Sequence, residues 1–185
     1  MRRSRSLGVF RNKLGNPSRL VESIQRGTIT LAGVDDATAT ITAVDPNRSV
    51  VMNLGNDSVA ANSGQRPERA FTNVTLTDAT TVTAAREATS GTVVLSYVVI
   101  QYEVGTISVQ RGELIVNGAT SNTATINSVD VARSYIVPGG IRGNTSSALW
   151  DRTQLYLVLT NLTTVTATKN TATDEAKAVY QVVSW

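Results

Sequence analysis

Few residues in this chain could do chemistry, because it contains neither histidine nor cysteine. Their absence excludes imidazole bases, thiolate nucleophiles, disulfides and the usual zinc, copper and haem ligands. A serine nucleophile would need a lysine as its base, and beyond the first 22 residues the only lysines are Lys169 and Lys177. Both stand in polar surroundings, and no glycine-rich loop is typical of a phosphate cradle. We therefore expect a protein that is not an enzyme and that uses no cofactor and no metal.

The charged residues recur in pairs rather than gathering in one cluster. The pairs are Asp45 with Asp130, Arg26 with Arg111, and Arg69 with Arg152. Recurrence of this kind favours structural roles, so we interpret the aspartates as turn caps and the arginines as partners in surface salt bridges. The adjacent residues Asp35 and Asp36 are most simply a turn. A calcium site there is the alternative, although the spacing of a dedicated calcium loop is absent.

These pairs belong to a longer internal repeat. The sequence Ser-Ile-Gln-Arg-Gly-Thr-Ile at 23–29 returns as Ser-Val-Gln-Arg-Gly-Glu-Leu at 108–114, an offset of 85 residues. From 76–86 onward the offset is 83 residues, and at the end Tyr97 and Tyr102 match Tyr180 and Trp185. An offset that changes by only two residues over such a length indicates one unit written twice. We predict two repeats, 23–103 and 104–185, behind a leader of residues 1–22.

Each repeat has the pattern of an antiparallel β-sandwich. Small polar and apolar residues alternate with a period of two, and β-branched threonine, valine and isoleucine dominate. The strands expected in the first repeat are 28–31, 38–44, 49–54, 70–76, 81–85 and 92–102, with a long loop at 56–68 matched by 138–147 in the second. The final strand, 92–102, is apolar on both faces, so we expect its outer face to meet another subunit. The linker, Val104-Gly105, is so short that the two units must touch.

The leader carries the positive charge of the protein. Residues 1–26 contain seven basic residues against Glu22 alone, whereas the rest of the chain is net negative, at −3. We predict an extended basic arm that anchors the protein along a neighbouring subunit, through Arg2, Arg3, Arg5, Phe10, Arg11 and Lys13. A tail that touches nucleic acid and an ordinary solvated tail are the alternatives. We do not expect nucleic acid as a partner, because no aromatic platform or groove-reading motif accompanies the arginines.

No apolar run approaches the roughly 20 residues of a membrane span, and the N-terminus lacks the apolar core of a secretory signal. We expect a protein that has no membrane partner and is assembled in the cytoplasm.

The repeat also resembles a known class of proteins. The stretches Ile-Gln-Arg-Gly-Thr-Ile (24–29), Ala-Thr-Ala-Thr-Ile-Thr-Ala-Val-Asp (37–45), Arg-Ser-Val-Val (48–51) and Leu-Thr-Asp-Ala-Thr-Thr-Val-Thr-Ala (76–84) resemble β-sandwich virion proteins of tailed bacteriophages. A looser similarity is to the H-type lectin sandwich, which trimerises through its strands. The resemblance covers residues 23–185. It implies a structural component of the virion, in capsid decoration or in neck, tail or fibre attachment.

Two functions therefore compete. In the first, the sandwiches assemble as a homotrimer that contacts other virion proteins, with an interface at Val94, Tyr97, Val99, Tyr102, Tyr180, Val182 and Trp185. In the second, the chain is a carbohydrate-binding adhesin or receptor-binding module of a phage tail, with its receptor site in loops 56–68 and 138–147. The aromatic fraction of only 5% favours the structural function, since sugar sites usually need exposed aromatic or convergent polar groups.

Overall fold

A computed structural model describes residues 20–59, 70–144 and 152–185. These residues form twelve β-strands and two short 3-10 turns, so the prediction of an all-β, antiparallel fold is confirmed. The strands are β1 (Val21–Ala32), β2 (Asp36–Thr40), β3 (Ser49–Val59), β4 (Asn73–Leu76), β5 (Thr81–Ala85), β6 (Thr92–Tyr102), β7 (Ser108–Val116), β8 (Ser121–Thr125), β9 (Ser134–Asn144), β10 (Leu155–Asn161), β11 (Thr164–Lys169) and β12 (Glu175–Ser184). The 3-10 turns are η1 (Pro46–Arg48) and η2 (Val131–Arg133).

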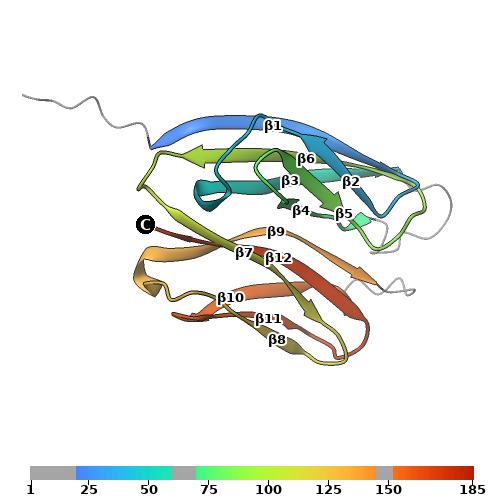
Figure 1. The fold of residues 1–185 in the computed structure, drawn as a ribbon. Coiled ribbons are helices and arrows are strands. Elements are labelled where there is room, and N and C mark those ends of the chain that lie inside the picture. Colours follow the sequence, from blue (N-terminus) through green and yellow to red (C-terminus); the bar gives the residue numbers. More distant parts are fainter. Residues whose placement is uncertain (1–19, 60–69, 145–151) are drawn as a thin grey trace, which may run out of the picture.

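The strands form two units, one above the other in Figure 1. In the first unit (β1 to β6), a sheet of order β1-β6-β3 faces strands in the order β2-β5-β4. In the second unit (β7 to β12), strands in the order β7-β12-β9 face a sheet of order β10-β11-β8. Numbered within each unit, the two strand orders are the same. A single pair of residues, Asn73 and Gly140, joins β4 to β9, so that one six-stranded sheet runs through both units.

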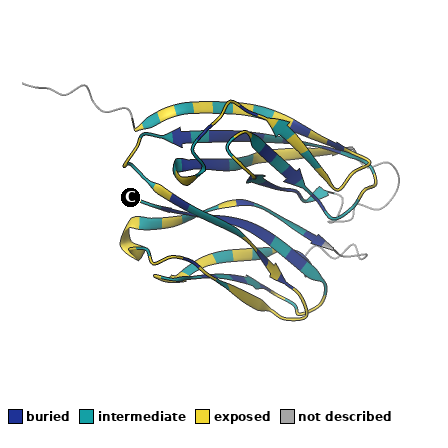
Figure 2. Ribbon diagram, viewed as in Figure 1, coloured by how far each residue is buried: buried dark blue, intermediate teal, exposed yellow. Residues whose placement is uncertain are grey.

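Each unit has its own hydrophobic core between its two sheets. In the first unit every strand contributes to the core, for example through Leu31, Val51 and Leu95. The core of the second unit is built in the same way, with Val116, Val165 and Val182. Along the outer strands less exposed and more exposed side chains alternate. Figure 2 shows this for β1, where intermediate and exposed residues alternate and Ile29 and Leu31 are buried. This alternation arises because successive side chains of a strand point to opposite faces of its sheet, which is why the period of two was visible in the sequence.

Both units share two local features that depend on glycine. In β3 the register with β6 shifts by one residue between Asn53 and Gly55, and in β9 the register with β12 shifts at Gly139. Each shift is a β-bulge, in which one extra residue is accommodated by a glycine of positive φ (125° at Gly55, 107° at Gly140).

The second shared feature is a close approach of a tyrosine to a glycine. A Cβ atom at Gly112 would lie 2.5 Å from the hydroxyl oxygen of Tyr180, and one at Gly27 would lie 2.6 Å from that of Tyr97. The glycine of the recurring Arg-Gly pair thus makes room for a tyrosine in the adjacent strand.

Several predicted boundaries were wrong. Residues 138–144, expected in a loop, belong to strand β9, because the two glycines form a bulge and not a turn. Strand β3 likewise continues to Val59, inside the loop expected at 56–68. Strand β1 begins at Val21, within the predicted arm. The units are connected by residues 103–107, and they touch as the short linker predicted, through a third apolar cluster centred on Val50, Val109 and Val183.

Among the residues that the structure describes, none forms a helix of the length and apolarity needed to cross a membrane.

Candidate functional site

The two lysines considered as catalytic bases are both held in polar contacts. The ammonium group of Lys169 is buried and donates to the carbonyl oxygens of Thr173 (3.1 Å) and Asp174, and burial lowers its pKa. Lys177 lies 2.9 Å from a carboxylate oxygen of Glu175 and 3.1 Å from one of Glu87. Burial lowers the pKa of Lys177, but hydrogen bonds to these two carboxylates outweigh it and the net shift is upward. Both side chains therefore tie segments of the fold together.

Asp35 and Asp36, the alternative calcium site, lie at the start of β2. The carbonyl oxygen of Asp35 accepts a hydrogen bond from the backbone N–H of Arg86 (2.7 Å), as expected for a turn that closes against β5. Within the described ranges, no three acidic side chains gather in a group that could hold a metal ion.

The recurring aspartates cap the two 3-10 turns, as predicted. An Oδ1 atom of Asp45 accepts from the backbone N–H of Asn47 (2.9 Å), and that of Asp130 accepts from Ala132 (3.0 Å). At both places the carbonyl oxygen of the aspartate also accepts from a serine hydroxyl at 2.7 Å. Because the caps match, each unit has the same rigid corner where its third strand begins.

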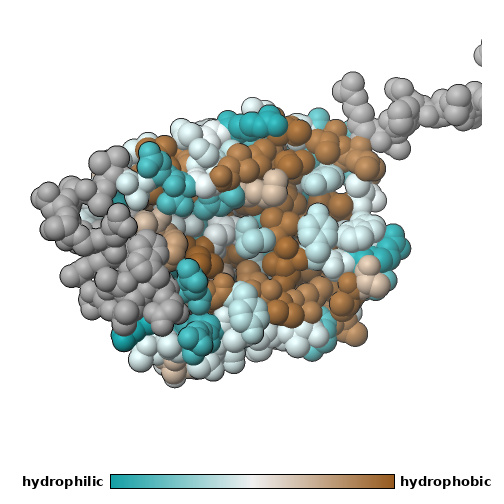
Figure 3. Space-filling model, turned by 180° about the vertical axis from the view of Figure 1, so that it is seen from behind, coloured by the Kyte–Doolittle hydropathy of each residue, from teal (hydrophilic) through white to brown (hydrophobic). Residues whose placement is uncertain are grey.

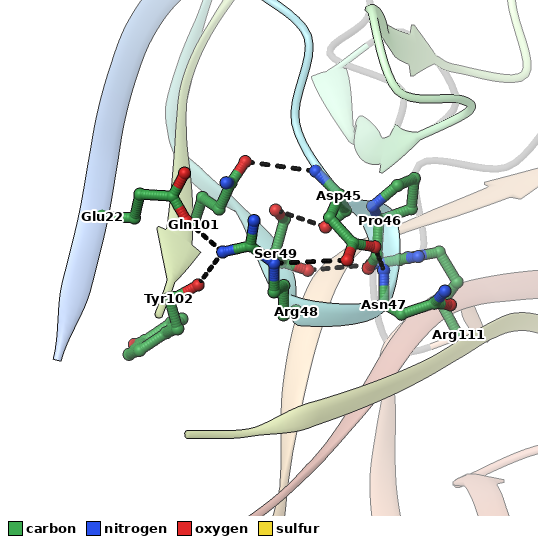
Figure 4. Close-up of polar contacts among 9 residues, drawn as sticks. All are labelled: Glu22, Asp45, Pro46, Asn47, Arg48, Ser49, Gln101, Tyr102 and Arg111. Atoms are coloured by element: carbon green, nitrogen blue, oxygen red, sulfur yellow. Dashed lines mark hydrogen bonds and ion pairs between the residues drawn. The ribbon is translucent and has the colours of Figure 1, made fainter. Parts of the chain in front are cut away.

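The corner of the first unit is reinforced by Arg48, which Figure 4 shows between Glu22, Tyr102 and Asp45. Its guanidinium group binds the carboxylate of Glu22 on β1, the carbonyl oxygen of Tyr102 at the end of β6, and the Oδ2 atom of Asp45 (3.2 Å). The hydrogen bond to Arg48 lowers the pKa of Glu22, and the same bond raises the pKa of Arg48.

The recurring arginines differ in their roles, and the prediction of surface salt bridges was only partly right. Arg152 pairs with Asp174 at 3.5 Å, as predicted. Arg111 instead donates to the carbonyl oxygens of Pro46 (2.6 Å) and Ser49 (2.8 Å) in the other unit, where burial lowers its pKa. Arg26, its equivalent on β1, is exposed. Arg69 lies outside the described residues.

The contact between the units places the outer face of sheet β7-β12-β9 against the edge of β3 and against the edge of β4, which pairs with β9 only at Asn73 and Gly140. Gln181 of β12 donates to the carbonyl oxygen of Val51 (2.6 Å) and accepts from its N–H (2.9 Å). Both residues are buried, with exposures of 1% for Gln181 and 0% for Val51. A single amide thus satisfies both backbone groups of an edge strand, which would otherwise be unpaired in the interior. The sequence contains a signal for this role, because Gln181 is the one polar residue in the apolar run 178–183.

Charged side chains make the remaining contacts between the two units. Arg142 of β9 lies 2.9 Å from Glu113 of its own sheet and 3.1 Å from Glu87 of the first unit. Asn73 of β4 donates to Glu113 at 3.2 Å. The internal contact therefore combines an apolar cluster, a buried amide and a set of ion pairs, and it holds the two units as one body.

The residues predicted to form a subunit interface mostly lie elsewhere. Tyr97 and Val99 belong to the core of the first unit, and Tyr180 and Val182 to that of the second. Since these four side chains point between the two sheets of their own unit, they are not available to a partner, and their assignment was wrong. The alternation of the strands places their neighbours outward instead. Of the remaining three residues, Val94 is half-buried, Tyr102 packs in the cluster between the units, and Trp185 is exposed.

Large apolar side chains are exposed on both units. On the first unit, Ile24 of β1 (46% exposed) and Leu54 at the bulge of β3 (57% exposed) face outward. On the second unit, Tyr156 of β10 is 61% exposed, and the rings of Tyr135 and Trp185 contact each other with centroids 5.6 Å apart. Seen from behind in Figure 3, hydrophobic residues form a band that crosses both units. Patches of this kind commonly mark surfaces for protein contact.

The predicted anchoring residues, Arg2, Arg3, Arg5, Phe10, Arg11 and Lys13, lie outside the described residues, so the arm stays a prediction.

Comparison with known proteins gave no match among family models, curated proteins or solved structures.

Proposed function

We propose that this chain is a non-enzymatic structural protein of a tailed bacteriophage virion. In this proposal it assembles through its β-sheets, in capsid decoration or in the neck, tail or fibre attachment, and the basic arm of residues 1–22 anchors it to neighbouring virion proteins.

The observation that carries the proposal is that buried contacts hold the two units together while large apolar side chains remain exposed on the outer surface. Buried contacts such as Gln181 with Val51 fix the two units to each other. Leu54 and Tyr156 nevertheless remain exposed on different units. A body of this kind suits a building block whose outer surfaces are completed by assembly. That the assembly is a phage virion is inferred from the resemblance of the repeat to phage β-sandwich virion proteins.

We also infer that the two units arose by internal duplication. The inference rests on the equal strand orders, the equal positions of the two bulges, and the matching caps at Asp45 and Asp130. Because the unit is duplicated, one chain can occupy two similar positions around a symmetry axis. A homotrimer would then present six similar units.

Mass spectrometry of purified phage particles from the strain that carries the gene tests the virion role. The chain should be present at a copy number that is a multiple of three. Its absence from particles, with the protein found only free in the lysate, would refute the proposal.

Light scattering on the full-length chain and on a shortened chain beginning at Leu20 tests the arm. An equal oligomer mass for both would assign self-association to the β-sheets and leave the arm free to anchor. An oligomer formed by the full-length chain alone would assign self-association to the arm.

One observation favours a second function, that of a carbohydrate-binding adhesin. Tyr135 and Trp185 form an exposed aromatic pair, with rings tilted by 54°, and exposed aromatic rings are typical of sugar sites. A glycan array with the wild-type chain and a Trp185→Ala variant tests this function. Binding that the variant loses would favour the adhesin, whereas an array without signal would leave the structural function as the better proposal.

A further inference from the structure

The internal contact between the units is heterologous, meaning that it joins two different surfaces. One is the outer face of a sheet, β7-β12-β9, which we call the docking face. The other is the groove between the edge of β3 and the edge of β4, which we call the edge groove; β4 pairs with β9 there only at Asn73 and Gly140. The docking face enters the edge groove at its bulge, where a Cβ atom at Gly139 would lie 2.4 Å from the carbonyl oxygen of Val74.

Each unit has both surfaces, because the strand orders are equal. The docking face of the first unit is the outer face of β1-β6-β3, and its bulge carries Leu54 at the position of Gly139. The edge groove of the second unit lies between β9 and β10. This groove is a cavity of about 270 Å³ lined by Ile136, Pro138, Ile141, Leu155, Tyr156 and Leu157. Within one chain, therefore, one docking face fills one edge groove, and a second pair of such surfaces is left over.

The leftover surfaces match each other in polarity. Besides the apolar residues Leu54 and Phe71, the filled groove has polar side chains at Asn53, Asn56 and Thr72, and Asn73 lies on its β4 edge. The residues at the four equivalent positions of the second unit are Pro138, Ile141, Leu155 and Tyr156, which line the open groove; Pro138 and Ile141 also border the filled one. The docking face that fills the first groove contributes Glu113, Lys177 and Gln181. The equivalent residues of the leftover face are Thr28, which is exposed, Val94, which is half-buried, and Val98, which is only 5% exposed within its own chain. At these positions the second unit's groove has apolar residues where the first unit's groove has polar ones, and the leftover face has two valines where the filling face has a lysine and a glutamine.

Arg111 and Arg26, at equivalent positions of the two repeats, are related in the same way: one makes the internal contact and the other is left over. Arg111 donates to carbonyl oxygens of Pro46 and Ser49 at the capped corner of the first unit. The second unit has an equal corner, capped by Asp130, and Arg26 stands exposed at the position equivalent to Arg111. Arg26 is therefore available for the corner around η2, where, among the residues that the structure describes, no arginine of the same chain donates as Arg111 does at η1.

We propose that a second copy of this chain docks its β1-β6-β3 face on the groove between β9 and β10. The contact follows the one made inside each chain except at the bulge: the internal contact has no room for a Cβ atom at Gly139, so with Leu54 at the equivalent position the two surfaces stand further apart, and the cavity of about 270 Å³ takes the leucine side chain. Leu54 enters the apolar groove beside Tyr156, and Arg26 binds the carbonyl oxygens at the corner around η2. This inference rests on the proposed function as a self-assembling structural protein and names the surface used. A heterologous contact produces a ring when its rotation closes and a filament when it does not, so three copies in a ring would present six units in sequence.

Cysteine cross-linking tests the contact directly, since the chain has no cysteine of its own. In the internal contact a Cβ atom at Gly140 would lie 3.0 Å from the Cα atom of Asn73. The equivalent residues between copies are Gly55 and Tyr156. A cysteine at Gly55 would be strained by its φ of 125°, so the test uses the neighbouring bulge residue, in two single variants of the full chain, Leu54→Cys and Tyr156→Cys. Under oxidation, the mixture of both variants should form a disulfide-linked dimer, and each variant alone should not. Equal cross-linking within either variant alone would indicate a two-fold contact and overturn the proposal, as would a mixture without cross-link.

Matched charge substitutions supply the second test. Leu54→Asp and Tyr156→Asp place a carboxylate in the proposed contact, and Leu162→Asp places one at an equally exposed site (51%) away from it. Light scattering should show that the first two variants fall to the monomer mass while Leu162→Asp keeps the wild-type mass, with unchanged circular dichroism in all three. An oligomer that survives both substitutions would overturn this contact but leave the virion role intact, because that role is decided by the presence of the chain in particles. Loss of the oligomer only after removal of residues 1–19 would indicate that the arm, and not the β1-β6-β3 face, occupies the groove. That result would also overturn the proposal.

Discussion

The buried amide of Gln181 permits a prediction whose magnitude follows from the structure. Replacement by leucine keeps the volume of the side chain but removes both hydrogen bonds to Val51, whose N–H and C=O groups lie in the interior. Each buried backbone group left unpaired costs about 1–3 kcal/mol. The apolar side chain recovers part of this cost, so we expect Gln181→Leu to lower the free energy of unfolding by about 2–4 kcal/mol.

The chain contains its own control for this experiment. Gln110 makes the same pair of hydrogen bonds, to the N–H (2.7 Å) and C=O (3.0 Å) of Asn127, but at the surface, where water can replace the amide. Gln110→Leu should therefore cost only about 0.5–1 kcal/mol.

Urea unfolding of the two variants, followed by circular dichroism, measures the difference. Amide hydrogen exchange adds a local probe, since the N–H of Val51 should exchange faster in Gln181→Leu. Equal unfolding free energies for the two leucine variants would refute the reasoning that the edge of β3 depends on Gln181.

Three further predictions concern features that recur in both units. Gly112→Ala should destabilise the fold by about 1–3 kcal/mol, because the new Cβ atom would overlap the hydroxyl of Tyr180; thermal unfolding measures this, and an unchanged midpoint would contradict the close approach. Burial raises the pKa of Tyr180 above its ordinary value of about 10, so the folded state keeps a proton that the unfolded state releases. Stability should accordingly fall as the pH rises from about 10 toward the folded-state pKa, and urea midpoints at pH 9 and pH 11 should show a smaller fall in Tyr180→Phe than in the wild type. Finally, the buried Arg86 donates to three backbone carbonyl oxygens, and the repeat places Lys169 in the equivalent position with contacts of the same kind. Arg86→Lys should therefore cost clearly less unfolding free energy than Arg86→Met, for which we expect a loss of about 2–5 kcal/mol; equal losses would show that the carbonyl contacts do not matter.

The contacts between strands show why some predictions succeeded and others did not. The alternation of threonine with valine and isoleucine follows from the geometry of a single strand, so it is readable without any partner. The caps at Asp45 and Asp130 are equally local, because each carboxylate binds a backbone group two residues away. Pro138 and the two glycines after it, by contrast, are typical of a turn in sequence, and only the neighbouring strand β12 makes them a bulge.

The sequence by itself determined the all-β class, the repeat and the absence of histidine and cysteine chemistry, since these depend on composition and on short-range periodicity. Only the tertiary structure decided which face of each strand is interior. Tyr97 and Tyr180 could have faced a partner as far as the sequence shows, and the packing of two sheets turned them inward. The tertiary structure also decided that Arg111 and Gln181 serve the other unit, because their partners lie 62 and 130 residues away along the chain. Contacts at such separation leave no local pattern, and they depend on how whole sheets are placed against each other.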